Sequence, residues 1–220
     1  MAGKLKADAQ RSTRTDGALA ILATAERLFG QFGLNGVTIR QITLAAGMAN
    51  NSAVAYHFGD REGLLKAICE WRVPELEQAG EAAWRVANAA GRLDDPSALI
   101  GVVLRPFLTV TDAQGNHVHA GFMHQMLRSA LGRSIRVSIF DNTASTVRAL
   151  NRLEAVLPGI PPALLRFRLR IAGAAFFDGL CEWDTGEKDS TLPDFTLETL
   201  VGELIAQAAV ICANPAGTQA

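Results

Sequence analysis

Residues 38–65 carry the pattern that most constrains how this chain can fold. Thr38, followed three residues later by Gln41, fits a capping box that would start a short helix. Gly47 can take the left-handed conformation that ends such a helix. One apolar side of the helix is formed at helical spacing by Ile39, Ile42 and Ala46. A short helix, a glycine turn and a second short helix together predict a DNA-binding helix-turn-helix.

The second short helix has an inner side and an outer side of different character. Val54 and Phe58 are four residues apart and should face inward. The outer surface is then left to Asn50, Asn51, Ser52, Ala55 and Tyr56. These side chains are mostly small and uncharged, so they can approach base edges in a major groove. Asn50 and Asn51 also suit a plain turn or a helix cap, and that alternative stays open.

Several blocks of this region resemble the TetR family of bacterial transcriptional regulators. They are AERLFGQFG at 25–33, LNGVTIRQI at 34–42, AAG at 45–47 and YHFGDREGLL at 56–65. Their order and spacing over about 50 residues make the resemblance specific, although it covers only the first third of the chain. The turn at residues 48–51 is one residue longer than the common form of the family. Ala55 stands where many members have a tyrosine that touches a phosphate.

The resemblance implies an all-α protein with a three-helix DNA-binding domain at 16–62 and a larger helical ligand-sensing and dimerisation domain at 63–220. Thr38 and Arg40 would open the first short helix, where its amides favour a phosphate. The positions that would meet base edges are Asn50, Asn51, Ser52, Ala53 and Ala55. Tyr56, His57 and Arg61 would hold the DNA backbone. We expect sequence-specific binding of double-stranded palindromic operator DNA by a homodimer.

The charge of the chain is distributed unevenly. The net charge is -1, but residues 1–61 hold seven Lys and Arg against four Asp and Glu, so this part carries +3. The asymmetry places the positive end on the proposed DNA-binding domain. Residues 1–15 are expected to be a disordered basic tail. The tail either reaches along a minor groove or is solvated and adds a little non-specific affinity.

Hydrophobic residues make up 49% of the chain in short, interrupted runs, so we expect no transmembrane helix. The N-terminus lacks the apolar core of a secretory signal. Cys69, Cys181 and Cys212 lie far apart in apolar contexts, which favours buried, reduced thiols. These features together predict a cytoplasmic protein without a membrane partner.

Helical spacing continues to the end of the chain. The first helix is expected at 16–32, and later ones at 61–90, 97–110, 118–131, 138–156, 161–183 and 195–213. The last two should form the dimer surface at about 161–213. The stripe on the final helix is Leu197, Leu200, Val201, Leu204, Ile205, Ala208 and Ile211, and the preceding helix has small residues around Gly173 and Gly179. The same stripes could instead fill the core of one subunit.

No catalytic motif stands out, so we expect neither an enzyme nor a cofactor. His117, His119 and His124 would form a metal site only if Asp178 or Glu182 joined them, and surface or pocket histidines are favoured over that reading. An apolar pocket for a small effector is predicted from Phe107, His119, Phe122, Met123, His124, Met126, Phe176, Phe177 and Asp178. The alternative for these residues is plain core.

The sequence thus favours a repressor that a small apolar ligand of unknown identity releases from its operator. Two alternatives remain. One is a ligand-independent DNA-binding protein with a protein partner, which a filled core would favour. The other is an all-α enzyme that uses the histidine-rich segment.

Overall fold

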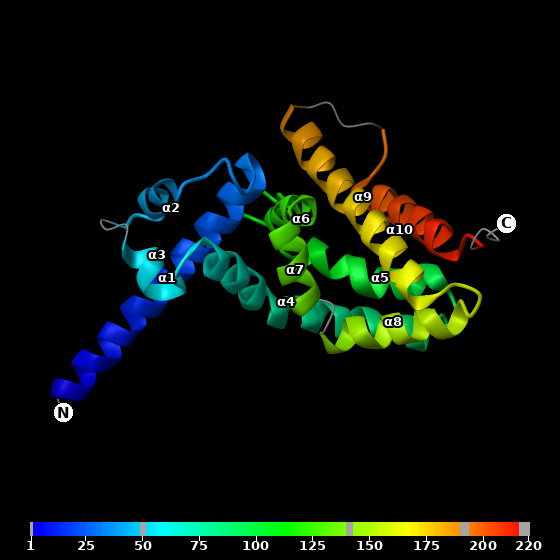
Figure 1. Ribbon diagram of the computed structural model, residues 1–220, viewed down its shortest axis with the longest axis horizontal. Helices are drawn as coiled ribbons and strands as arrows, with labels where there is room; N and C mark the ends of the chain where they lie inside the picture. Colours follow the sequence, from blue (N-terminus) through cyan, green and yellow to red (C-terminus); the bar gives the residue numbers. More distant parts are fainter. Residues whose placement is uncertain (1, 49–51, 140–142, 190–193, 216–220) are drawn as a thin grey trace.

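The computed structural model describes residues 2–48, 52–139, 143–189 and 194–215. All regular structure in these ranges is helical, which confirms the expected all-α class. The helices are α1 (Ala2–Phe32), α2 (Ile39–Ala45), α3 (Ser52–Phe58), α4 (Arg61–Ala89), α5 (Pro96–Leu104), the 3-10 helix η1 (Arg105–Thr109), α6 (Val118–Arg128), α7 (Ala130–Ile139), α8 (Ala144–Val156), α9 (Pro162–Asp189) and α10 (Leu197–Ala213). Figure 1 shows α2 and α3 at one end of the molecule and α9 with α10 toward the other.

Helix α1 begins much earlier than expected. Residues 2–15, predicted to be a disordered tail, continue the helix that we expected only from Asp16. The segment contains no proline and is rich in Ala, Lys, Arg and Gln, which favour a helix once a packed helix follows directly. In Figure 1 these first turns of α1 extend past α3, away from the larger domain.

A small core joins α1 to the two short helices. Ile21, Ala25 and Phe29 of α1 are buried together with Ile42 of α2 and Val54 of α3. Helical spacing had assigned Ile42 and Val54 to the inner sides of the two short helices. Burial of these side chains fixes the orientation of α2 and α3 on α1 and leaves their other sides exposed.

Helix α4 connects this three-helix unit with the rest of the chain. It begins after a cap at Asp60, whose Oδ1 accepts a hydrogen bond of 2.8 Å from the amide of Gly63. Pro74 lies inside α4 and cannot donate a hydrogen bond to the preceding turn, which favours a bend there. A domain boundary at 62–63 therefore falls in the first turn of one continuous helix.

Three predicted helices differ from the observed elements. The segment 97–110 divides into α5 and η1, because Pro106 has no N–H to continue the helix. The segment 118–131 ends at Arg128, where Ser129 is extended, and its hydroxyl accepts from the amide of Gly132 in the additional helix α7. Helix α8 consequently begins at Ala144 and not at 138.

The larger domain packs directly on α1 as well as through α4. Helices α1 and α6 cross where Gly30 approaches Gly121, and a Cβ on Gly30 would lie only 3.0 Å from the amide nitrogen of Phe122. A second close approach joins α9 to α10, where a Cβ on Gly179 would lie 2.8 Å from Leu204. At the crossing of α1 and α6 the neighbouring atoms are backbone, so only glycine fits there, whereas the atom nearest to Gly179 is the end of the Leu204 side chain. None of the described helices combines the length and apolar character that a bilayer-spanning segment needs.

Much of the predicted α10 stripe packs within the subunit. Val201, Ile205 and Ala208 are buried against the same chain, and Leu204 packs on Gly179. At these positions the stripe fills the core of one subunit, which was the alternative to a dimer surface. The apolar side chains left exposed on the two helices are Phe167, Ile171, Val210 and Ile211.

Candidate nucleic-acid interface and effector cavity

The start of α2 is fixed by the predicted capping box. The amide of Gln41 donates to Thr38 Oγ1 at 3.2 Å, and the amide of Thr38 donates to Gln41 Oε1 at 2.8 Å. The Thr38 hydroxyl also donates to Gln41 Oε1. Gly47 adopts φ +72° where the helix ends, as its position in the sequence predicted. The cap thus holds both polar groups of Thr38 within the protein.

The outer sides of α2 and α3 form one exposed surface, which we call the reading surface. It consists of Arg40, Leu44, Ser52, Ala55 and Tyr56. Tyr56 is 63% exposed and lies edge-on to the half-buried ring of His57 at 5.0 Å. Ala53, predicted to meet bases, is half-buried against the core and is turned partly away from this surface. Asn50 and Asn51 lie outside the described residues, and their role stays a prediction.

Arg61 faces into the protein and not toward DNA. Its guanidinium donates to the carbonyl oxygens of Leu34 and Val37, and it lies over the ring of Phe29 at 5.5 Å. These carbonyls belong to the turn between α1 and α2, where no helix supplies a donor, so the arginine satisfies them. Arg61 therefore holds this turn in place. The assignment of Arg61 as a phosphate contact does not fit this geometry.

A buried polar cluster lies where α1, α4 and α6 meet. Glu26 of α1 is 1% exposed and accepts from Arg72 of α4 at 3.0 Å and 2.5 Å, and His119 of α6 places Nδ1 2.6 Å from Glu26 Oε1. Because a carboxylate only accepts, Nδ1 carries the proton that it donates. Burial by itself raises the pKa of Glu26, but hydrogen bonds from His119 and Arg72 outweigh it and hold this pKa below its ordinary value of 4.5.

This cluster changes the role of His119. The sequence assigned it to the effector pocket, but it is fully buried and serves as the partner of Glu26. Sequence reasoning did not single out Glu26, because a glutamate in an amphipathic helix is normally solvated. The only available signal was its position one residue after Ala25, on the buried side of α1.

A cavity of about 80 Å³, partly open to solvent, lies within the larger domain. Phe107, Met123 and Phe177 line it, as predicted. The remaining wall is formed by Leu76, Val103, Leu104, Pro106, Leu127, Arg136, Thr143, Ser145, Thr146, Leu150, Arg166, Leu169, Arg170 and Gly173. Its volume is smaller than that of typical small-molecule pockets, so a drug-sized ligand would have to widen it. The cavity is therefore bounded by α4, α5, η1, α6, α7, α8 and α9.

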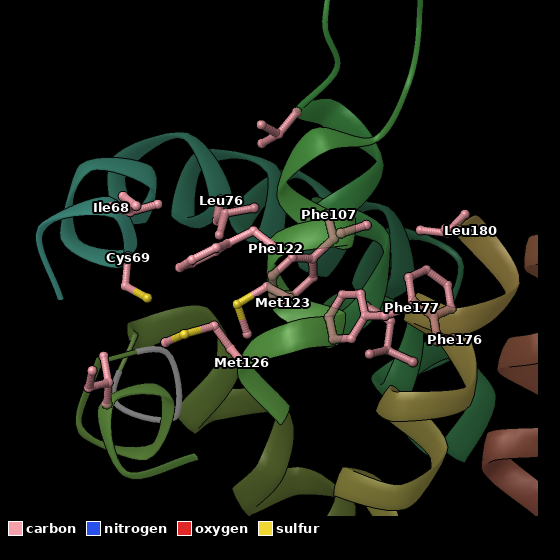
Figure 2. Packing of buried hydrophobic residues seen from close by; sticks show 14 of the residues in the cluster. Ile68, Cys69, Leu76, Phe107, Phe122, Met123, Met126, Phe176, Phe177 and Leu180 are labelled. Atoms are coloured by element: carbon pink, nitrogen blue, oxygen red, sulfur yellow. The ribbon is translucent and has the colours of Figure 1, made fainter. Parts of the chain in front are cut away.

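The other predicted pocket residues lie elsewhere. Phe122, Met126 and Phe176 are fully buried in the core and do not line the cavity, so the plain-core alternative holds for them. Figure 2 shows these three side chains packed with Phe107 and Phe177 in the hydrophobic core. His124 lies 3.6 Å from Asp178, whose side chain is 65% exposed. The sequence could identify these helices but not the rotation that decides which side of each one meets the void.

The three clustered histidines point to three different carboxylates. His117 Nδ1 lies 2.8 Å from Asp184, His119 contacts Glu26, and His124 faces Asp178. Among the described residues no group of three or more His, Cys, Asp or Glu side chains is placed to hold a metal ion. The histidine-rich segment thus makes separate contacts with α1 and α9.

The three cysteines are free thiols in the structure. Burial raises the pKa of Cys69 to about 12, and that of Cys181 and Cys212 to about 11. Thiols with such pKa values carry little thiolate near neutral pH and react slowly. Their chemistry agrees with the structural role that the sequence suggested.

Comparison with known proteins agrees with this architecture. Residues 21–68 match the family described as bacterial regulatory proteins, tetR family. The HTH-type transcriptional repressor AcnR of Corynebacterium glutamicum is 26% identical over 164 residues, covering 74% of this chain and 85% of that protein.

Solved structures share the fold. A tetR family transcription regulator from Marinobacter aquaeolei VT8 aligns with a TM-score of 0.55 at 15% identity, over 91% of this chain and 97% of that one. A structure from Shewanella sp. PV-4, described as belonging to the same family, also gives 0.55, at 18% identity over 87% and 95%. The match over residues 21–68 identifies the helix-turn-helix domain as one of the tetR family, and the curated repressor indicates a DNA-binding transcriptional regulator. The solved structures show that the larger domain shares their helical fold.

Proposed function

We propose that this protein is a homodimeric repressor that binds a palindromic operator and leaves it when a small molecule occupies the cavity. The observation that carries the DNA-binding part is the reading surface. Arg40, Ser52, Ala55 and Tyr56 are exposed on two short helices whose other sides are buried. A rigid helix with small polar side chains outward suits a major groove. Arg40 and Tyr56 would contact phosphates, and Ser52 and Ala55 would meet base edges.

The dimer proposal rests on the apolar side chains that α9 and α10 leave exposed. Phe167 and Ile171 on α9 are 49% and 48% exposed, and Val210 on α10 is 71% exposed. Large apolar side chains grouped on two adjacent helices are typical of an interface. A two-fold axis through this face would pair the helices of two subunits and place two reading surfaces on one side of the DNA.

The cavity supports the sensing part of the proposal, because contacts lead from its wall to α1. Phe107 lines the cavity and stacks on His119, with ring centroids 5.7 Å apart and planes 2° from parallel. His119 bonds to Glu26 of α1, the helix on which α2 and α3 are mounted. A ligand that moves Phe107 would therefore bias the position of the DNA-binding domain, and DNA would reciprocally weaken ligand binding.

The cavity wall favours binding over catalysis. In the described part of the chain its lining contains no His, Asp or Glu, the side chains that most often act as general base. The presence of this cavity also favours a ligand-responsive regulator over a DNA-binding protein with a filled core.

Selection of binding sites from random duplex DNA tests the proposal. We expect a palindrome whose half-sites lie about one helical turn apart or slightly more. Ser52→Ala should then weaken binding to the selected site by about 1–2 kcal/mol and leave random DNA nearly unaffected, as measured by fluorescence anisotropy. Ser134→Ala, an exposed change on α7, is the control. Failure to enrich any sequence would overturn the operator assignment.

A further inference from the structure

The wall of the cavity carries charge of one sign. Three arginines line it, Arg136 of α7 with Arg166 and Arg170 of α9, and the described lining contains no carboxylate. We infer, building on the proposed sensing role, that the effector is an amphiphile with an apolar body and an anionic head group. The sequence had indicated only an apolar ligand, because helix positions alone do not show which arginines turn toward a void.

The arginines are not equivalent. Arg166 is 53% exposed and already pairs with Glu154 at 3.0 Å, so its charge is partly balanced. Arg170 is half-buried and lies over the ring of Phe167, with its guanidinium carbon 4.8 Å from the centroid. Stacking on a ring uses the face of a guanidinium and keeps its N–H groups in the plane directed outward. The structure assigns Arg170 as the main anchor for the anion.

An anionic head group is expected because the three guanidinium charges lie in an otherwise apolar wall. Around them lie Leu76, Leu104, Phe107, Leu150, Leu169 and Phe177. Such walls exclude water and strengthen the field of the guanidinium groups, so an anion is attracted and a cation is repelled. Guanidinium groups also match the oxygens of a carboxylate or phosphate in two parallel hydrogen bonds. The apolar surface accepts the body of the same ligand.

Three probes with the same ten-carbon chain separate the head group from the body: decanoate, decyl phosphate and 1-decanol. Isothermal titration of the full chain at pH 7.5 should show at least one anion binding about tenfold or more tightly than 1-decanol. The ratio of the two anions identifies carboxylate or phosphate as the preferred head. Raising the salt concentration should weaken anion binding and leave 1-decanol unaffected.

Variants assign the preference to the arginine. Arg170→Gln should bring the affinity for the anion close to that for 1-decanol, while the affinity for 1-decanol itself stays the same and shows that the cavity is intact. Arg170→Lys should keep part of the preference. Arg128→Gln, an exposed change on α6 outside the lining, is the matched control. If Arg170→Gln disturbs folding, Arg136→Gln and the salt dependence of the unaltered protein provide the same test.

The outcomes separate this inference from the proposed function. Equal binding of 1-decanol and both anions, or an anion preference that survives loss of Arg170 and Arg136, overturns the inference. DNA release is measured independently by anisotropy on the selected operator. An anion that binds selectively without releasing DNA would reject the release mechanism and leave the ligand class standing.

Discussion

Nδ1 of His119 lies 2.6 Å from Oε1 of Glu26, and both side chains are almost completely excluded from solvent. The pair joins α6 of the larger domain to α1 of the DNA-binding domain, and Arg72 of α4 completes the cluster. The position of α2 and α3 relative to the cavity thus depends on polar contacts between three helices as well as on apolar packing.

Removing the Glu26 carboxylate should be costly. Glu26→Gln leaves the charge of Arg72, whose side chain is only 15% exposed, without its main partner, and we expect a loss of about 3 kcal/mol in the free energy of unfolding. Glu75→Gln removes the other partner of Arg72, a 44% exposed carboxylate, and should cost less than about 1 kcal/mol. Urea unfolding measures both, and equal losses would show that burial of the cluster is unimportant.

The same carboxylate should make stability depend on pH. Because the folded-state pKa of Glu26 lies below 4.5, the unfolded chain binds more protons than the folded one between these two values. The contribution of Glu26 is complete above the unfolded pKa and is lost as pH falls through the folded pKa. The difference in unfolding free energy between the unaltered protein and Glu26→Gln should be constant above about pH 5.5 and shrink below pH 4.5. A difference that grows on acidification would contradict the assignment.

Gly30 should tolerate no side chain at the crossing of α1 and α6. A Cβ there would lie 3.0 Å from the Phe122 nitrogen and 3.1 Å from the Gly121 carbonyl carbon, so Gly30→Ala should force the helices apart and cost about 1–3 kcal/mol. Gly17→Ala lies in the same helix, but its Cβ would meet only the Met48 side chain at 3.8 Å. That control should be neutral or stabilising by up to about 1 kcal/mol. Thermal unfolding measures the stability of each variant, and operator affinity shows whether the DNA-binding domain has been displaced. Equal stability of Gly30→Ala and Gly17→Ala would argue against a tight crossing of α1 and α6.

Arg61 and Arg40 should behave differently toward salt. Arg61 holds the carbonyls of Leu34 and Val37, so Arg61→Gln should destabilise the DNA-binding domain without changing the slope of log affinity against log salt in the folded fraction. Arg40 is exposed on the reading surface, and Arg40→Gln should lower that slope by about one unit. Anisotropy titrations over a range of salt concentrations measure the slope. A flatter slope for Arg61→Gln would restore that residue as a phosphate contact.

Val210 offers a sharper test of the dimer than the buried stripe. Val210→Glu places a charge at a 71% exposed position of α10, so it should leave the subunit folded and weaken self-association strongly if this face is the interface. Val86→Glu on α4 changes a side chain of nearly equal exposure, 70%, and should leave association unchanged. Sedimentation velocity at micromolar concentration distinguishes them. A monomeric unaltered protein, or dissociation by both variants, would reject the proposed interface.

Local rules were sufficient for the DNA-binding end. The Thr38–Gln41 capping box and the left-handed Gly47 follow from residues within one helical turn, and each forms as predicted. Helical periodicity likewise identified the inner residues Ile42 and Val54. Such signals depend on the backbone and on near neighbours, so a single sequence determines them.

Long-range contacts determined the rest. Arg61, Glu26 and His119 each have partners between 24 and 93 residues away, and no local pattern distinguishes such side chains from solvated or ligand-binding ones. The residues that line the cavity could not be identified locally either. Phe122 and Met123 are adjacent in α6, yet only Met123 lines the cavity. The sequence by itself determined most of the helical segments and the apolar positions within them. Only the tertiary structure decided which side of each helix is buried, paired or open, since a rotation of less than one turn changes the neighbours of every side chain.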